Sequence, residues 1–262
     1  MLSKNKQKFI LSLTRKKNRD QQGLFVAEGH KLVSDLLSSK AHVHTLVATS
    51  QWLASHPQPT ARNFEIIEAD QAAIKKISTL KSPPDVVGIF LQDKNPLTIT
   101  DLRNSLSLFL DEVQDPGNLG TIVRLADWFG IQHIICTPTC ADIYNPKTIQ
   151  STMGAIARVD VHYRDASVFL SEYKKLELPV YGTFLDGDNI YSETLSNTGL
   201  IVMGNEGKGI SKAVESAVSH RLFIPAYPAD LPTSESLNVS VATAITCAEF
   251  RRQATASPSS SR

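Results

Sequence analysis

The sequence predicts an α/β protein made of two consecutive units. Short apolar segments typical of strands alternate with amphipathic segments typical of helices along most of the 262 residues. A polar stretch that contains a proline, residues 94–105, interrupts this alternation and predicts a linker between units 1–93 and 106–254. The hydrophobic fraction of 42% is sufficient for one large core or two smaller ones.

The first unit is expected to begin with a helix over residues 3–14, followed by a basic loop over 14–23. Strands and helices then alternate, as the change between the two hydrophobic periods indicates. Asp70 is the expected N-cap of the last of these helices. The expected strands span 24–29, 43–49, 64–69 and 86–92, and the expected helices span 30–39, 50–56 and 70–79.

The second unit starts with a mostly apolar strand, residues 106–113, of the kind that is buried on both faces of a parallel sheet. A Pro-Gly turn then leads into a helix that ends at Gly130. Ser234 or Ser236 is the expected N-cap of the final helix, and the low-complexity tail 255–262 is expected to be disordered. The other expected strands span 133–138, 159–163, 179–185, 199–203 and 221–226. The other helices span 145–154, 165–176 and 236–253, and a further helix is expected to start at the end of the glycine-rich turn 204–211.

Charge is spread unevenly along the chain. The formal net charge is only +1, yet the first 20 residues contain seven basic side chains and one acidic side chain. Such a cluster is either a surface that contacts phosphates or a solvated helix and loop. The composition alone leaves both interpretations open.

Several classes of protein are disfavoured by what the chain lacks. No apolar run approaches the roughly 18 residues of a membrane span, and the polar N-terminus does not suit a signal peptide. We therefore expect a cytoplasmic protein with no membrane partner. Cys136, Cys140 and Cys247 show no CxxC spacing and no histidine at ligand spacing, so we expect free thiols and no metal site.

Two glycine-containing turns follow strands of the second unit, where open α/β sheets bind ligands. The turn at 204–211 fits neither GxGxxG nor Walker A spacing, so it indicates either a ligand loop or a plain tight turn. The turn at 115–118 opens a helix, whose N-terminal N–H groups favour an anion such as an RNA phosphate. Asn118 is the expected cap of this helix, and Arg124 is either functional or merely solvated.

Three strings then occur in order: NLGTIVR from residue 118, IVMGNEGKGIS from 201 with IPA following at 224, and SLNVSVATAI from 236. Together they resemble the three signature motifs of the SpoU (TrmH-like) family of RNA ribose methyltransferases. STMGAIARVDV is similar to the Ser-x-Gly-Ala stretch between the first two motifs, with Thr152 in place of the usual serine. LFVAEGHKLVSDLL, from residue 24, resembles the small RNA-binding domain of one branch of the family.

This resemblance implies a C-terminal catalytic domain with a mainly parallel sheet and a trefoil knot, preceded by a smaller α/β RNA-binding domain. It implies S-adenosylmethionine as cofactor, a homodimer, and methyl transfer to a ribose 2′-hydroxyl, with ribosomal RNA expected rather than transfer RNA. The methyl group on a sulfonium is electrophilic, so the reaction needs no metal. By motif position, the cofactor-binding residues are Gly204, Asn205, Gly207, Ile224 and Leu237.

The resemblance also assigns roles in catalysis and RNA binding. Arg124 stands where the family has its proposed base, but a guanidinium is normally protonated and is therefore a poor base. Its minimal role is to clamp a phosphate and orient the 2′-oxygen. The expected catalytic residues are Arg124, Asn118, Ser236, Asn238 and Glu206, and the expected RNA contacts are Arg15, Lys16, Lys17, Arg19 and Lys31.

Two alternatives compete with this hypothesis. One keeps the fold but transfers the methyl group to an RNA base, and the other is a non-catalytic RNA-binding or ribosome-assembly factor. The intact polar residues of all three motifs favour the ribose methyltransferase over both. The loop 226–235 is longer than the family's usual connection, which leaves its effect on the pocket open.

Overall fold

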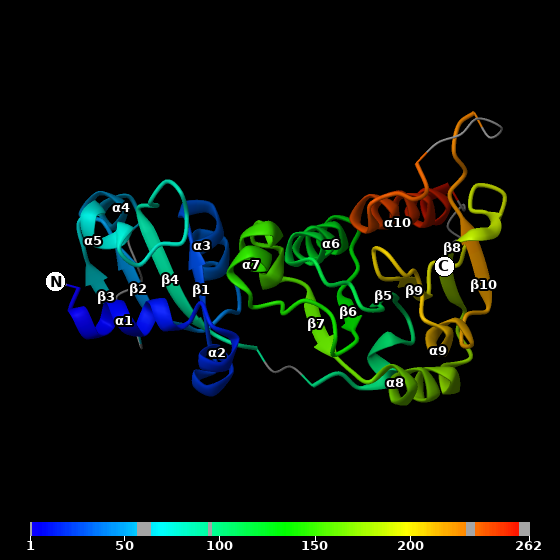
Figure 1. The fold of residues 1–262 in the computed structure, drawn as a ribbon, viewed down its shortest axis with the longest axis horizontal. Helices are drawn as coiled ribbons and strands as arrows, with labels where there is room; N and C mark the ends of the chain where they lie inside the picture. The colour runs from blue at the N-terminus through cyan, green and yellow to red at the C-terminus, as the bar shows by residue number, and fades with distance from the viewer. Residues whose placement is uncertain (1, 57–63, 94–95, 229–233, 257–262) are drawn as a thin grey trace, which may run out of the picture. The chain divides into compact units, whose positions relative to one another are not determined.

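The computed structural model describes residues 2–56, 64–93, 96–228 and 234–256. Two compact units are present: Met1–Lys94 with Asp142–Arg158 form unit 1, and Asn95–Ala141 with Val159–Arg262 form unit 2. Within these ranges, each unit contains one sheet, which can be followed in Figure 1. The tail expected to be disordered lies outside the described residues from position 257 onward.

Unit 1 contains a four-stranded sheet in the order β1-β4-β2-β3. β4 is antiparallel to both of its neighbours, whereas β2 and β3 are parallel. The strands are β1 (Leu24–Glu28), β2 (Val43–Ala48), β3 (Glu65–Glu68) and β4 (Val86–Leu91). The helices that precede or connect them are α1 (Lys4–Ser12), α2 (Lys16–Gln22), α3 (His30–Leu37), α4 (Ser50–Ser55) and α5 (Gln71–Lys75).

Alternation along the strands of unit 1 builds two separate cores, one on each face of its sheet. Leu24 and Val26 of β1 pack with apolar residues of α1 and α5. Phe25 and Ala27, which point to the other face, pack with residues of α3 and α4. Asp70 caps α5 by accepting a hydrogen bond from Ala73 N, so the expected cap is confirmed.

The basic segment 14–23 forms a helix, α2, so the expected loop is wrong there. Arg19 of α2 is only 1% exposed, and its guanidinium donates to the carbonyl oxygens of Leu13 and Thr14. It also pairs with Asp142 at 2.6 Å. A charge count could not reveal that one of the seven basic side chains is buried in a structural role.

Residues 142–158 pack in unit 1, although they follow and precede strands of unit 2. This segment contains α7 (Pro146–Thr152) and the short 3-10 helix η2 (Ala155–Ala157). Ile149 is buried in the core formed with α3 and α4, and the Tyr144 ring lies 5.0 Å from the ring of Phe25. The sequence predicts that residues 106–254 form the second unit, whereas the contacts assign residues 142–158 to unit 1.

Unit 2 contains a six-stranded sheet in the order β10-β8-β9-β5-β6-β7, and every pair in it is parallel. The predicted α/β fold with a mainly parallel sheet is thereby confirmed. The strands are β5 (Leu106–Leu110), β6 (His133–Cys136), β7 (Asp160–Tyr163), β8 (Val180–Asn189), β9 (Gly199–Met203) and β10 (His220–Phe223). The helices are η1 (Ile99–Leu102), α6 (Pro116–Trp128), α8 (Ala166–Tyr173), η3 (Lys174–Leu176), α9 (Lys212–Glu215) and α10 (Val239–Ala256).

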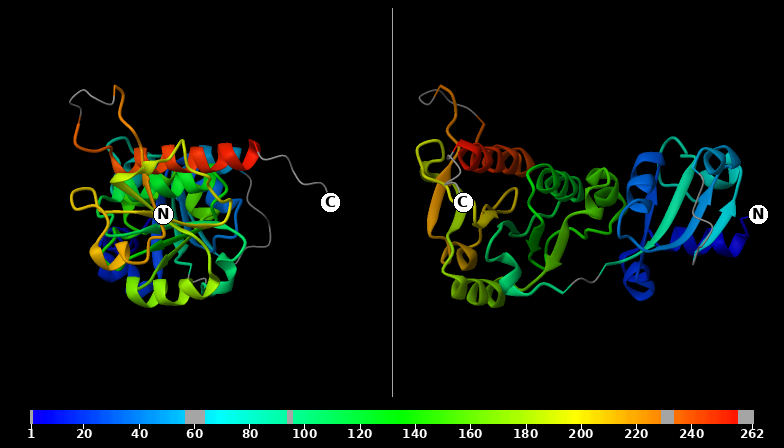
Figure 2. Two further views of the ribbon diagram at one scale, coloured as in Figure 1. Left: turned by 90° about the vertical axis from the view of Figure 1, so that its right-hand side faces the viewer. Right: turned by 180° about the vertical axis from the view of Figure 1, so that it is seen from behind.

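Helices cover both faces of this sheet, as Figures 1 and 2 show. α6 and α10 pack together on one face, where Phe250 meets the ring of Tyr181 edge-on. α8 covers the other face, where Phe169 stacks on Phe109 with ring centroids 5.6 Å apart. Leu102, from the stretch expected to be a linker, is fully buried in this second core.

Two further observations concern the cysteines and membrane-spanning helices. Cys136, Cys140 and Cys247 are free and buried, as expected. Within the described ranges, no helix combines the length and apolar character needed to span a membrane.

The buried pair of Arg19 and Asp142 should be essential for the stability of unit 1. Arg19→Ala is expected to lower the free energy of unfolding by about 3–5 kcal/mol, because it leaves a largely buried carboxylate without its main partner. Urea unfolding followed by the fluorescence of the buried Trp52 would measure this. Lys17→Ala, in the same helix but exposed, should stay within about 0.5 kcal/mol, and equal effects of the two substitutions would contradict the assignment.

Candidate methyl-transfer site

The carboxyl ends of β5 and β9 lie side by side, because these neighbouring strands run parallel with Leu110 opposite Met203. The first and second motif segments leave the sheet at this point. Open α/β sheets bind their ligands at the carboxyl ends of two neighbouring strands whose connections lead to opposite sides of the sheet. The register of one strand pair thus brings together two segments that are about 90 residues apart in sequence.

Two side chains from opposite segments connect these strand ends. Asp111 is 3% exposed, and its carboxylate accepts a hydrogen bond from Ser211 N at 2.7 Å. Asn205 donates from Nδ2 to the carbonyl oxygen of Glu112 at 2.8 Å. The sequence shows that the strand ends in acids, but we predicted no role for Asp111, although a carboxylate at this edge is itself a signal.

The glycine-rich loop after β9 is a tight backbone turn. Asn205 and Gly209 exchange two backbone hydrogen bonds, and Asn205 Oδ1 accepts from the N–H groups of Gly207 and Lys208. A Cβ at Gly204 would lie 2.3 Å from the carbonyl carbon of Gly209, and Gly209 itself has φ +70°. The glycines at 204 and 209 are therefore required by the turn itself.

The N-terminus of α6 differs from the expected arrangement. Asp115 is the N-cap, accepting from Asn118 N at 2.9 Å, and Pro116 occupies the first turn. Asn118 is therefore not the cap, and its side chain is available for another purpose. A proline at the first helical position after an aspartate is a strong start signal, and it would have identified the correct cap.

Glu206, Asn118 and Asn238 form a hydrogen-bonded chain that links all three motif segments. Asn118 donates from Nδ2 to Glu206 Oε1 at 3.0 Å, and Asn238 donates from Nδ2 to Asn118 Oδ1 at 3.0 Å. Glu206 also accepts long hydrogen bonds from the backbone N–H groups of Gln114 and Asp115. Both polar atoms of the Asn118 side chain are thus occupied, which fixes its orientation.

The Glu206 carboxylate is stabilised in its charged form. Partial burial raises its pKa, but the hydrogen bonds from Asn118 and from the two backbone N–H groups outweigh this and hold the pKa below its ordinary value. Glu206 is therefore ionised at neutral pH, and it acts as an acceptor that positions Asn118.

Asn238 begins the last helix, and the expected caps Ser234 and Ser236 do not. Its Oδ1 accepts from Ser240 N at 2.9 Å and from Ser240 Oγ at 2.6 Å. Ser236 and Leu237 precede it and are exposed, Leu237 to 46%. Ile224, half-buried after β10, completes the set of predicted cofactor contacts.

Arg124 lies on an exposed face of α6, away from the hydrogen-bonded chain. Six residues separate it from Asn118, which corresponds to about 9 Å along the helix and about 120° around it. Thr121 and Trp128, at helical spacing from Arg124, are exposed on the same face. Among the described residues, Arg124 has no hydrogen-bond or ion-pair partner, so its charge is available to a ligand.

Four of the five predicted RNA contacts are exposed on unit 1. Arg15, Lys17 and Lys31 are exposed, and Lys16 is exposed while lying 3.3 Å from Asp20. Arg19 is the exception, and we withdraw it as an RNA contact because its guanidinium is buried and bonded within the unit.

Two neighbouring cysteines, Cys136 and Cys140, contact Leu110 at the end of β5. The hydrogen bond from the Cys136 thiol, opposed by burial, lowers the pKa of Cys140 to about 7. Cys140 is 8% exposed and donates to the carbonyl oxygen of Leu110 at 3.2 Å. Its burial argues against a role as a nucleophile.

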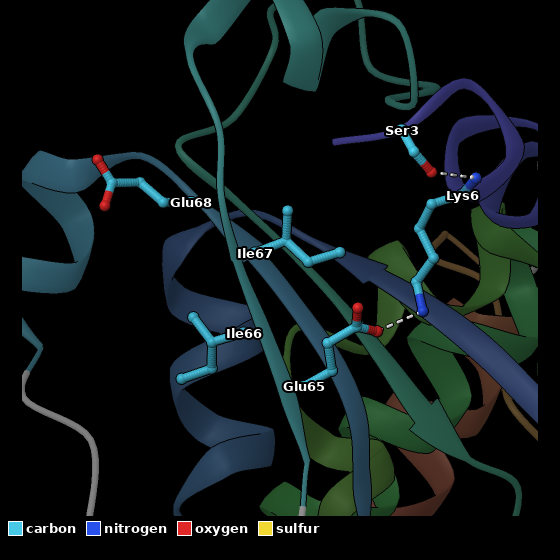
Figure 3. A pocket seen from close by; sticks show the side chains of 6 residues that line it. All are labelled: Ser3, Lys6, Glu65, Ile66, Ile67 and Glu68. Atoms are coloured by element: carbon cyan, nitrogen blue, oxygen red, sulfur yellow. Dashed lines mark hydrogen bonds and ion pairs between the residues drawn. The ribbon is translucent and has the colours of Figure 1, made fainter. Parts of the chain in front are cut away.

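A cavity of about 320 Å³ lies in unit 1, remote in sequence from the three motifs. Ser3, Lys6 and the four residues of β3 line it, and Lys6 forms an ion pair with Glu65, as Figure 3 shows. None of the predicted site residues lines this cavity, and we assign it no part in catalysis.

Comparison with known proteins identifies the family. Residues 105–248 match the SpoU rRNA Methylase family, and residues 4–88 match an MRM3-like substrate binding domain. The chain belongs to the SpoU rRNA methylase family. The resemblance inferred from the three motifs is thereby confirmed, including the separate N-terminal domain.

Several relatives of this SpoU family member align over almost its whole length. The 23S rRNA (guanosine-2′-O)-methyltransferase RlmP of Bacillus subtilis is 29% identical over 88% of this chain and 89% of its own. A solved TrmH-family structure from Porphyromonas gingivalis is 39% identical, covers 97% of this chain and 99% of that one, and gives a TM-score of 0.86. An AdoMet-bound rRNA methyltransferase from Sinorhizobium meliloti is 31% identical, with 96% and 97% coverage and a TM-score of 0.86.

The turn at Gly204 gives a stability test of the site. Gly204→Ala is expected to destabilise the protein by about 1–3 kcal/mol, because the new methyl group overlaps backbone atoms that cannot move cheaply. Gly207→Ala is the matched control, since the atom nearest to its new Cβ is 3.8 Å away. Thermal unfolding of both variants measures the difference, and a Gly204→Ala protein as stable as Gly207→Ala would contradict the geometry.

Proposed function

We propose that this protein transfers a methyl group from S-adenosylmethionine to a ribose 2′-hydroxyl of ribosomal RNA. The observation that carries the proposal is the chain of hydrogen bonds from Glu206 through Asn118 to Asn238. It joins the three motifs of a family member at the carboxyl edge of its parallel sheet. A non-catalytic relative would have no need to keep all three polar side chains bonded to one another.

The residues at this edge fit the methyl donor. Leu237 and Ile224 would supply apolar contacts, while Gly204, Asn205 and Gly207 would offer the backbone of an ordered loop. Leu237 is 46% exposed beside the capped helix start, as suits a side chain that a ligand covers. When bound, the cofactor supplies an electrophilic methyl group. The trefoil knot of the family is part of this proposal.

The protein's own side chains have positioning roles. Asn118, held on both sides, and Ser236, exposed before the last helix, would hold the nucleotide. Arg124 would clamp a phosphate and orient the 2′-oxygen through charge-assisted hydrogen bonds. Alignment of the oxygen behind the carbon–sulfur bond is the main requirement of such a reaction.

We also propose a homodimer with the site close to its interface. Trp128 is 83% exposed at the end of α6, and Val241 is 47% exposed on α10, which packs against α6. Exposed apolar side chains on adjacent helices favour a protein partner. Because Arg124 shares a face of α6 with Trp128, a dimer formed there would place Arg124 at its border.

Unit 1 would bind the RNA, through the exposed Arg15, Lys16, Lys17 and Lys31. The match to an MRM3-like substrate binding domain supports this role, and the names of the relatives favour ribosomal RNA over transfer RNA. A cytoplasmic location, and a reaction without a metal ion, complete the proposal.

The reaction is tested with methyl-labelled S-adenosylmethionine and unmodified ribosomal or transfer RNA. Label should appear in a 2′-O-methyl nucleoside from ribosomal RNA, and Arg124→Ala should reduce it about 100-fold or more, because the 2′-oxygen is no longer aligned. Arg103→Ala, an exposed arginine at the opposite end of β5, should leave the rate unchanged. Label on a base would favour the alternative reaction, and indifference to Arg124→Ala would contradict the assigned role.

RNA binding is tested separately from catalysis. Replacing Arg15, Lys16 and Lys17 together by alanine should weaken RNA binding and reduce the dependence of log Kd on log salt by about 3, one for each phosphate that the variant no longer neutralises. Binding of S-adenosylmethionine should not change. Replacing the exposed Lys174, Lys175 and Lys212 of unit 2 is the control, and equal weakening in both variants would show that only net charge matters.

A further inference from the structure

Two histidines and an aspartate gather at the edge of the sheet in unit 2. One potential ligand atom from each of His133, Asp160 and His162 lies within 4.8 Å of those of the other two. His133 is the first residue of β6, and Asp160 and His162 are the first and third residues of β7. Sequence spacing hid this group, because 27 positions of chain separate His133 from Asp160.

The register explains why the three side chains meet. His133 lies opposite Asp160 in the parallel ladder, so both project from the same face. His162 follows Asp160 by two residues and therefore shares that face, which is the one that α8 covers through Ile135 and Phe169. The group stands at the amino ends of the strands, whereas the methyl-transfer site lies at their carboxyl ends.

The chemistry of this group suits a metal ion. Nδ1 of His133 is buried and, among the described residues, has no hydrogen-bond partner, since Asp160 Oδ2 is 3.9 Å away. A buried polar atom of this kind calls for an unseen ligand or water. Two imidazoles and one carboxylate form the donor set of many three-residue zinc sites, with the fourth position left to water.

We propose that His133, Asp160 and His162 bind a zinc ion. Tetrahedral bonds of about 2.0–2.1 Å place ligand atoms about 3.4 Å apart. The three side chains must therefore move toward one another by roughly an ångström, which side-chain rotation at the start of the strands allows. The site is independent of the methyl-transfer proposal and has no part in that reaction.

The location points to a structural role. Among the residues that the structure describes, β7 is an edge strand that pairs with β6 alone, and Asp160 stands almost where the chain returns to unit 2 after residues 142–158. An ion held by both strands would fix this return point and stabilise the edge strand of the sheet. The ion would thereby stabilise the sheet at the amino ends of β6 and β7, whereas the candidate catalytic loops leave the carboxyl ends of the central strands β5 and β9.

The test uses the full chain after treatment with a chelator. Titration with zinc chloride in a calorimeter should show one saturable site per chain, and zinc should raise the melting temperature. Cobalt(II) added in place of zinc should give visible bands of a tetrahedral nitrogen and oxygen site. A sulfur-to-cobalt charge-transfer band would instead place the metal at Cys136 and Cys140, and the absence of saturable binding would equally overturn the proposal.

Substitutions then locate the site. His162→Asn and Asp160→Asn should each weaken zinc binding at least about tenfold, since even outer-shell partners of a metal ligand are worth about 10–100-fold. His220→Asn, an exposed histidine of β10, is the matched control and should leave affinity unchanged. Binding of S-adenosylmethionine by each variant reports whether unit 2 is folded. Unchanged zinc affinity in folded His162→Asn protein would contradict the proposal.

Discussion

The parallel pairing of β5 with β9 is the constraint on which the rest of the site depends. β6 and β7 extend the sheet from one side of this pair, and β8 and β10 extend it from the other. The strand order therefore reverses here, and the turns that leave β5 and β9 lead on to strands on opposite sides of this pair. Asp111 and Asn205 hold these turns together with hydrogen bonds across the pair. A shift in the register of β9 would separate Glu206 from Asn118.

The third motif reaches this place through helix packing. α10 lies against α6, so the start of α10 meets the start of α6, and Asn238 caps one helix while donating to Asn118 of the other. Asn238 thus has a local task in its own helix and a second task between segments, whereas both hydrogen bonds of the Asn118 side chain join it to other segments. These contacts between distant segments explain why a short polar side chain is needed at each position, and why helix propensity alone identified neither role.

The sequence predicted the elements well and their contacts poorly. Among the described residues, hydrophobic periods predicted the strands and most of the helices between them, because each element buries one face or both. α2 was missed because its residues are polar, and it is held by the burial of Arg19 against Asp142, a partner 123 residues away. The same lack of long-range information concealed the packing of residues 142–158 in unit 1. The order of the three motifs predicted the candidate site, which the charge pattern, the glycine spacing and the capping rules had left open.

Geometry by itself does not distinguish methylation of a ribose from methylation of a base. The hydrogen bonds from Glu206 through Asn118 to Asn238 fix the side-chain amide of Asn118. A fixed amide can orient either a ribose hydroxyl or a base as the methyl acceptor. The distinction depends on Arg124, whose exposed position on α6 suits a phosphate next to the target ribose better than a base held edge-on. A guanidinium that stays protonated can orient an oxygen nucleophile without removing its proton. The preference for a ribose hydroxyl therefore rests on two arguments: the position of Arg124 suits the phosphate backbone of RNA, and the chain belongs to the SpoU rRNA methylase family.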